Sequence, residues 1–161
     1  MNTRLTIGIM TVIVILLGVF VFINMSGGNL GSFLAPLFNT TGKVIIDNHT
    51  FTVFEAKSEK EKELGLSGRN SIGDNQGMIF IFDKPDTYGF WMKNMKFAID
   101  IIYISNKKIV TIYPNVPFPK DPTQELKIYT PSEPADTVVE FKSGTTLKYN
   151  FKVGDSVTTS L

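Results

Sequence analysis

The amino-acid sequence predicts a mostly β domain of sandwich, jelly-roll or barrel type with two short helices, preceded by one N-terminal transmembrane helix. Residues 5–23 carry no charged side chain, which predicts the membrane span. From residue 43 onward, short apolar runs are separated by turn residues about every ten positions, a spacing typical of β-sandwiches and barrels. Two short segments with helix signals interrupt these runs.

The uncharged run reads LTIGIMTVIVILLGVFVFI and is long enough to cross a bilayer. As a helix it would span roughly 28 Å, close to the hydrocarbon thickness. Arg4 precedes the run and no further charge occurs before Lys43. The positive-inside rule therefore places the N-terminus in the cytoplasm and the C-terminal domain outside the cell membrane, as a single-pass protein. The alternatives are a buried soluble helix and a cleaved signal peptide, whose apolar core is usually shorter, about 7–15 residues.

The chain accordingly divides into an anchor at residues 1–25, a flexible linker at residues 26–42 and an extracytoplasmic β domain at residues 43–161. Gly and Ser at the start of the linker favour flexibility. Its apolar patch, Phe33–Phe38, is expected to pack on the domain or to lie at the membrane interface, with a partner site as the alternative. The β domain has about 120 residues, which suffice for one self-sufficient core.

Turn residues and helix caps predict the elements of the domain. The segment Asp47–His49 has the chemistry of a hairpin turn. Ser58 and Glu61 form a capping box for a polar helix that ends at Gly65, and residues 145–151 are a weaker helix candidate. The Pro-rich loop at residues 114–122 cannot pair as a central strand. The expected strands are Lys43–Ile46, Thr50–Ala56, Met78–Phe82, Phe90–Met92, Ile99–Ile104, Ile109–Tyr113, Lys127–Tyr129, Val138–Phe141 and Ser156–Thr159.

Composition excludes several classes of function. The chain has no Cys and one His, which excludes disulfide scaffolds, thiol chemistry and zinc fingers. Its net charge of +1 argues against a nucleic-acid partner, because phosphate binding needs a concentrated basic surface. We expect no metal and no cofactor. A copper(I) site from Met78, Met92 and Met95 is disfavoured, because strand alternation would place Met92 and Met95 on opposite faces.

A series of short motifs in the β domain carries a family resemblance. The motifs are Glu61-x-x-x-Gly65-Leu66-x-x-Arg69, Gly77–Phe82, Phe90–Asn94, Ile99–Ile101, Pro134-Ala135, Val138–Glu140, Gly144 and Val153–Asp155. The series resembles the family called domain of unknown function 192, and the element Phe90–Asn94 is its most specific part. The resemblance implies a compact β-sandwich or jelly-roll-like domain, often behind a signal sequence or an anchor, and no agreed biochemical activity. This chain departs from the family pattern at Ser67, Met95 and Ala98, where Met, Thr and Pro are usual.

Five polar or aromatic residues are candidate ligand-binding residues: Arg69, Trp91, Lys93, Asn94 and Asp100. Lys93 near Asp100 could bind an anionic or sugar-like ligand, with Asn94 supplying directional hydrogen bonds. The favoured alternative is a buried ionic network of Arg69, Lys93 and Asp100 that fixes loop geometry. For Trp91, core packing is favoured over an exposed platform for a sugar or a partner. No residue is assigned a catalytic role.

These observations favour a membrane-tethered binding or accessory module, for an envelope protein or a small polar ligand, over an enzyme. The one His has no nucleophile elbow and no metal-ligand spacing around it. The alternative is an envelope carbohydrate-active hydrolase that uses Asp100 with Lys93, or with a second carboxylate such as Glu140.

The predicted anchor can be tested on the full-length chain. We expect it to stay in the membrane pellet after an alkaline carbonate wash, because a spanning helix is held by the hydrocarbon core. A tag placed after Leu161 should be accessible to protease from outside the cytoplasmic membrane. Release by carbonate, or a tag found in the cytosol, would contradict the anchor.

Overall fold

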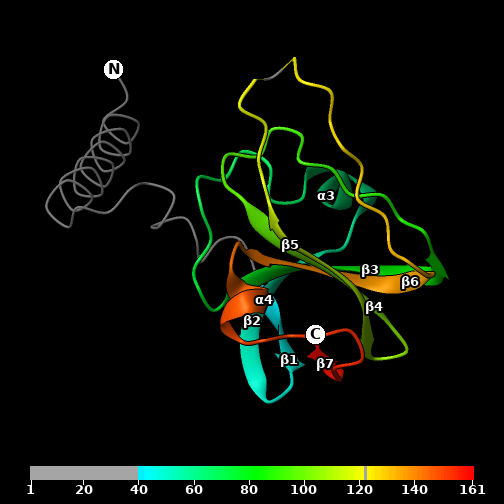
Figure 1. The fold of residues 1–161 in the computed structure, drawn as a ribbon. Coiled ribbons are helices and arrows are strands. Elements are labelled where there is room, and N and C mark those ends of the chain that lie inside the picture. Colours follow the sequence, from blue (N-terminus) through cyan, green and yellow to red (C-terminus); the bar gives the residue numbers. More distant parts are fainter. Residues whose placement is uncertain (1–39, 122) are drawn as a thin grey trace, which may run out of the picture. The chain divides into compact units, whose positions relative to one another are not determined.

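Seven strands form one strongly curled sheet in the computed structural model, which describes residues 40–121 and 123–161 (Figure 1). The elements are β1 Thr40–Ile46, β2 His49–Ala56, α3 Glu59–Leu64, β3 Gln76–Asp86, β4 Ile99–Ser105, β5 Lys108–Val116, β6 Ala135–Lys142, α4 Thr145–Lys148 and β7 Val157–Ser160. The strand order is β5-β4-β6-β3-β2-β1-β7. The prediction of a mostly β domain with two short helices is therefore confirmed.

The sheet closes on itself at one end, as in a partly opened barrel. Its edge strands, β5 and β7, meet through an isolated bridge between Lys108 and Ser156. The Ile109 N–H donates to the Asp155 carbonyl at 3.0 Å, and the Gly154 N–H donates to the Ile109 carbonyl at 2.8 Å. Of the architectures expected from the sequence, the observed one is barrel-like, because all strands belong to one sheet rather than to two stacked sheets.

The predicted membrane anchor and most of the predicted linker, at residues 1–39, lie outside the described residues. The first strand begins at Thr40, so β1 includes the last residues of the range expected to be linker. Within residues 40–121 and 123–161, no helix has both the length and the hydropathy needed to span a bilayer.

Both hairpin turns and the first helix follow the sequence signals. Asp47 and Asn48, between β1 and β2, have positive φ values of 42° and 69°, as a two-residue type I′ turn requires. Asn106 and Lys107 make the same kind of turn between β4 and β5. At α3, Ser58 and Glu61 form the expected capping box. Because β2 and β3 are parallel neighbours, α3 lies in the crossover that connects them.

Four expected elements differ from the structure. The segments Phe90–Met92 and Lys127–Tyr129 contribute only a single bridge, between Phe90 and Tyr129, rather than two strands. The second helix ends at Lys148, earlier than expected. Strand β5 continues through Pro114 to Val116, which is possible because β5 is an edge strand and Pro114 needs no donor on its open side.

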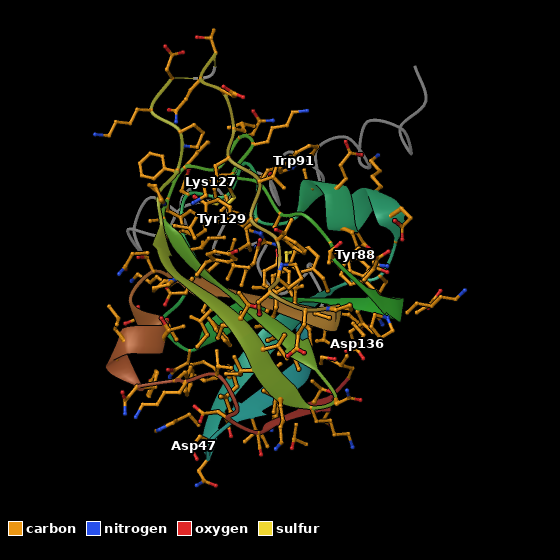
Figure 2. All side chains as sticks on the ribbon, turned by 45° about the vertical axis from the view of Figure 1, so that its right-hand side comes forward. Asp47, Tyr88, Trp91, Lys127, Tyr129 and Asp136 are labelled. Atoms are coloured by element: carbon orange, nitrogen blue, oxygen red, sulfur yellow. The ribbon has the colours of Figure 1, made fainter. Side chains whose placement is uncertain are left out.

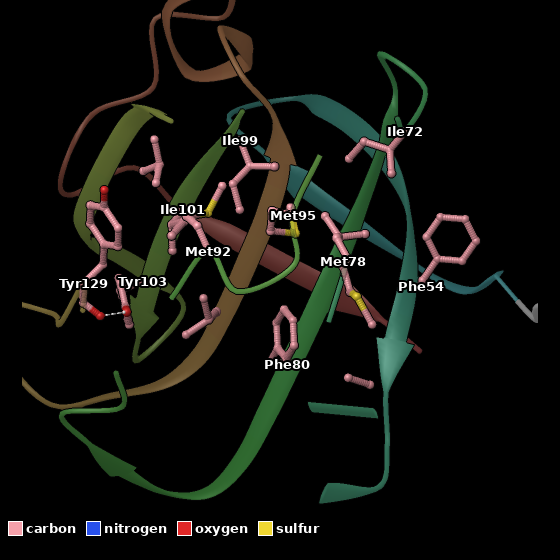
Figure 3. Packing of buried hydrophobic residues seen from close by; sticks show 14 of the residues in the cluster. Phe54, Ile72, Met78, Phe80, Met92, Met95, Ile99, Ile101, Tyr103 and Tyr129 are labelled. Carbon is pink, nitrogen blue, oxygen red and sulfur yellow. Dashed lines mark hydrogen bonds between the residues drawn. The ribbon is translucent and has the colours of Figure 1, made fainter. Parts of the chain in front are cut away.

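The sheet buries apolar side chains on both faces. The inner core lies on the face enclosed by β1, β5 and β7, and the outer core lies on the opposite face, beneath the loops. Alternation along each strand decides the face, so Ile79 belongs to the inner core while Met78 and Phe80 belong to the outer core (Figure 3). Inner-core residues are Val44, Ile46, Phe51, Val53, Ile79, Ile102, Ile104, Ile109, Val139, Phe141, Phe151 and Val157.

A buried carboxylate, Asp100 on β4, joins two connections at one end of the sheet. Its side chain is fully buried and accepts four hydrogen bonds. The donors are the N–H groups of Asn115 at 2.8 Å, Gly144 at 3.1 Å and Thr146 at 2.7 Å, and the Thr146 hydroxyl at 2.8 Å. Asn115, at a register irregularity in β5, and Gly144, before α4, both have positive φ, so Asp100 stabilises two backbone segments whose conformations are unfavourable.

This arrangement predicts that Asp100→Asn lowers stability. An amide in place of the carboxylate would turn an NH₂ group toward backbone donors and lose charge-assisted bonds, at a cost of roughly 2–4 kcal/mol. Urea unfolding followed by the fluorescence of Trp91, the chain's one tryptophan, measures the loss. Asp83→Asn, at an exposed position on β3, is the matched control and should leave the midpoint unchanged.

Candidate functional site

A cavity of about 180 Å³ opens between α3, the outer face of β3 and the loop that follows β3. One of its polar lining residues comes from β6, and five of the fourteen lining residues are aromatic. Figure 2 shows Tyr88 and Trp91 at the α3 side of the domain, with Asp47 at the opposite end. The lining residues are Lys62, Glu63, Leu64, Gly65, Leu66, Ser67, Phe80, Phe82, Tyr88, Gly89, Phe90, Trp91, Met95 and Glu140.

Glu140 is the polar group at the floor of this cavity. It lies on β6 between Met78 of β3 and Ile101 of β4, in the middle of the sheet, and only 5% of the residue is exposed. Its Oε2 atom has no hydrogen-bond partner. Burial raises the pKa of the Glu140 carboxyl to about 8, so the group is mostly neutral at pH 7.

Aromatic rings form the wall above Glu140. The Phe80 and Phe90 rings meet edge-to-face with centroids 4.9 Å apart, and the Phe82 and Tyr88 rings stack at 3.7 Å. Trp91 lies at the cavity mouth with 45% of its surface exposed. The expectation that Trp91 packs in the core is therefore wrong. Its neighbours Phe90 and Met92 point toward the core instead. Phe90 makes only an isolated bridge with Tyr129, so no neighbouring strand among the described residues covers Trp91.

Two lysines lie against the outer rings of the wall. The Lys62 Nζ is 4.9 Å from the centroid of Phe82 and 3.0 Å from the Glu59 carboxylate. The Lys93 Nζ is 5.6 Å from the centroid of Trp91. Each contact is a cation–π interaction at an exposed or half-buried position. The outer part of the cavity therefore already holds ammonium groups against aromatic faces.

A glycine keeps the cavity open as far as Glu140. Gly65 ends α3 with φ of 51°, a conformation that side chains rarely adopt. A Cβ atom at this position would lie 3.6 Å from the Phe80 Cζ and 4.0 Å from the Glu140 Oε2. A methyl group there would occupy the space in front of the carboxyl.

Tyr103 holds the loops that surround the cavity. Its hydroxyl group lies 2.7 Å from the Tyr129 carbonyl, a hydrogen bond drawn in Figure 3, and 3.1 Å from the Tyr88 carbonyl. The one hydroxyl proton is shared between the two carbonyls, so Tyr103 joins both loops to β4. Burial raises the pKa of this phenol, so it stays a donor at physiological pH. On the other side, the Ser67 hydroxyl donates to the Lys93 carbonyl at 2.7 Å, and the Gly68 N–H to the Asn94 carbonyl at 3.1 Å.

Comparison with known families matches residues 42–159 to DUF192, a family described as uncharacterized ACR. The match covers most of the chain. The chain belongs to the DUF192 family. The resemblance found in the sequence motifs is thereby confirmed, and membership brings no known activity with it. No functionally curated protein matches the chain.

Two solved structures share the DUF192 fold of this chain. A protein of unknown function from Novosphingobium aromaticivorans DSM 12444 is 29% identical, with a TM-score of 0.65 over 72% of this chain and 83% of the other. A putative transcription regulator from Sinorhizobium meliloti 1021 is 28% identical, with a TM-score of 0.64 over 73% of this chain and 91% of the other.

The structure distributes the five predicted site residues over different environments. Trp91 and Lys93 meet at the mouth of the DUF192 cavity. Asn94 adopts positive φ and joins its loop to Gly68 through the backbone. The Arg69 guanidinium lies 4.6 Å from the Phe54 ring centroid, and partial burial lowers its pKa.

The fifth residue, Asp100, is held by uncharged donors from β5 and α4. The expected ionic network of Arg69, Lys93 and Asp100 is therefore wrong for Asp100. Strand alternation explains the outcome, because Asp100 points to the inner face of the sheet.

The three methionines proposed for copper lie together in the outer core. Met92 and Met95 do not take opposite faces as expected, because the chain turns between them and the Met95 N–H donates to the Met92 carbonyl at 3.2 Å. All three side chains pack among apolar and aromatic residues. Among the described residues, no group of three His, Cys, Asp or Glu side chains could hold a metal ion.

Glu140 is the site residue that sequence reasoning undervalued. Beyond its place in the motif Val138–Glu140, the sequence suggests it as a second carboxylate for Asp100, yet the two residues lie on opposite faces of the sheet. The available signal was the run Val138-Val139-Glu140-Phe141, in which one acid interrupts an otherwise apolar strand. An acid in such a run is expected to be buried on one face.

The raised pKa of Glu140 predicts that stability falls with pH. The unfolded state releases this proton near pH 4.5 but the folded state keeps it until about pH 8. The free energy of unfolding should therefore decrease from pH 5 to pH 9, by roughly 4 kcal/mol, and level off above that range. Urea unfolding at several pH values measures this decrease.

Two variants separate Glu140 from other acids. Glu140→Gln should remove the decrease, and the exposed Glu133→Gln should retain it. Hydrogen bonds lower the pKa values of Glu61, Asp74 and Asp121, which therefore titrate below this window. An unchanged profile in Glu140→Gln would show that Glu140 is already ionised in the folded protein.

Proposed function

We propose that this DUF192 domain is a binding module that admits a small polar ligand, or a polar side chain of a partner, into the cavity above Glu140. One observation carries the proposal: a buried carboxyl with an unpartnered Oε2 faces a cavity that opens to solvent. An unpartnered buried polar group costs about 1–3 kcal/mol. A ligand that donates to Glu140 would remove that cost.

Glu140 contributes little to holding the fold, which supports a role in binding. The other buried carboxylate, Asp100, accepts four hydrogen bonds from the backbone and Thr146. Glu140 Oε2 accepts none, although Glu140 lies in the middle of the sheet. An aliphatic side chain at this position would extend the outer core without a desolvation cost. A ligand accounts for an unpartnered acid in the lining of a cavity.

The hydrolase alternative has less support from this geometry. A pair of carboxylates must flank one glycosidic bond from facing positions. Asp100 and Glu140 lie on opposite faces of the sheet, and the Asp100 oxygens are occupied by structural hydrogen bonds. Lys93 is exposed and lies against Trp91, at the mouth of the cavity on the outer face of the sheet. Asp100 points to the inner face, so Lys93 does not lie beside it.

We also propose that this module is tethered outside the cytoplasmic membrane. Support comes from the uncharged run at residues 5–23 and from Arg4 on its N-terminal side. A tethered binding domain would meet either a diffusing ligand of the cell envelope or a neighbouring envelope protein. No nucleic-acid partner is proposed.

Ligand binding to the full-length chain in detergent can be followed by the fluorescence of Trp91 at the cavity mouth. Panels of monosaccharides, amino acids and simple amines are the probes. We expect members of at least one panel to shift the emission, with at least tenfold weaker binding to Gly65→Ala, whose methyl group would obstruct the space in front of Glu140.

Gly68→Ala is the matched control. Gly68 also has positive φ, at 77°, but a Cβ there meets nothing within 4 Å. Both variants carry backbone strain, and only Gly65→Ala fills the cavity. The binding proposal fails if no panel shifts the emission, or if both variants bind every probe as the wild type does.

A further inference from the structure

We propose, on the basis of the binding function above, that the group which reaches Glu140 is a primary alkylammonium, an NH₃⁺ group on an apolar stem. Such a group belongs to small amines and to the lysine side chain of a partner protein. Both sources offer the same chemistry at the floor of the cavity.

The count of unpartnered polar atoms favours a ligand with one polar end. Among the described residues, Glu140 Oε2 is the one buried side-chain oxygen or nitrogen without a hydrogen-bond partner. The neighbouring wall is formed by Phe80, Phe90, Leu66 and Met95. A sugar ring would bring several hydroxyl groups into this apolar space and leave most of them unpaired. An ammonium at the tip of an apolar stem would need only the carboxyl and the ring faces.

The aromatic wall suits a cation. The outer rings, Phe82 and Trp91, already have the ammonium groups of Lys62 and Lys93 against them. Phe80 lies close to Glu140 at Gly65 and contacts Phe90, and no cation of the described residues is found over either ring. A ligand cation at this position would have aromatic surface on its sides and a carboxylate at its end.

The size of the cavity fits a short stem. About 180 Å³ corresponds to roughly six water molecules at their share of liquid volume. An ammonium with four carbons has five heavy atoms, so its volume fits within this cavity. Gly65 keeps the passage in front of the carboxyl clear.

The charges that face the cavity allow a cation to enter. Lys62 and Glu63 line it with opposite charges, Lys62 is also paired with Glu59, and Lys93 lies against Trp91 at the mouth. The two lysines are therefore matched by two carboxylates. The phenols of Tyr88 and Tyr103 lie nearby, and Tyr103 is neutral because burial raises its pKa. Because burial raises its pKa to about 8, the Glu140 carboxyl carries a proton at pH 7 before a ligand binds. When the ammonium binds, the carboxyl O–H bond breaks, the proton passes to the buffer, and a carboxylate–ammonium pair remains.

The test uses four probes on the full-length chain in detergent at pH 7 and constant ionic strength. They are n-butylammonium chloride, the neutral analogue n-butanol, tetramethylammonium chloride, which cannot donate a hydrogen bond, and glucose. Trp91 fluorescence reports binding. We expect n-butylammonium to bind at least tenfold more tightly than each of the other three probes.

Variants identify the group responsible. Glu140→Gln should weaken n-butylammonium binding at least tenfold and leave n-butanol unchanged, while the exposed Glu133→Gln should behave as wild type. Calorimetry in two buffers of different ionisation enthalpy should show release of close to one proton per n-butylammonium bound at pH 7. Glu140→Gln should show no proton release. If Glu140 had only a structural role, ligand binding would release the same number of protons from the wild type and from this variant.

The outcomes separate this inference from the binding function. If glucose or n-butanol binds as tightly as n-butylammonium and Gly65→Ala removes that binding, the cavity binds ligands but the ammonium inference is overturned. Equal n-butylammonium binding to wild type and Glu140→Gln would also overturn it. If no probe and no panel compound shifts Trp91, both proposals fail.

The source of the ammonium is the last arm of the test. Nα-acetyl-lysine N-methylamide, whose side-chain ammonium is free, and a lysine-containing peptide are compared with n-butylammonium. Tighter binding of the peptide supports a protein partner, and tighter binding of the free amine supports a small molecule. Either ranking supports the shared chemistry, and failure of all three to bind more tightly than n-butanol overturns it.

Discussion

Burial on both faces of the central strands is the constraint on which the rest of this domain depends. Strands β3, β4 and β6 have one face in the inner core and the other under the loops of the outer core. A carboxyl group on such a strand is largely removed from bulk water, so it must be hydrogen-bonded or neutral. Asp100 takes the first solution, facing inward to donors from β5 and α4. Glu140, facing outward, takes the second.

The outer core is covered by irregular segments rather than by a second sheet, and this difference creates the cavity. The chain between β3 and β4 packs over the sheet through Phe90, Met92 and Met95, and Tyr103 ties it to the loop that carries Tyr129. Between this cover and α3 the sheet is left with an opening, and Glu140 lies beneath it. Loops held by a rigid sheet are a common setting for binding sites.

Local signals predicted much of the fold and little of the site. The hairpin turns and the Ser58 capping box depend on neighbouring residues, so the sequence was sufficient for them. The five candidate residues are polar or aromatic side chains that lie near one another along the chain. Whether these side chains meet depends on the face of the strand to which each one points and on the turn at Asn94. In the structure Asp100 is buried and separated from Lys93, while Trp91 is exposed. Glu140 approaches Gly65 and Phe80 only through pairing between distant strands, which a single sequence does not reveal.

The position of β1 in the sheet has a mechanical consequence. Although β1 is first in the chain, it lies between β2 and β7 and is antiparallel to both. A pull on the polypeptide before Thr40 would therefore load two hydrogen-bond ladders at once, in shear along the strand, instead of peeling away a free edge. Ladders loaded lengthwise share the force among all their bonds. The domain is built to resist traction from its N-terminal side.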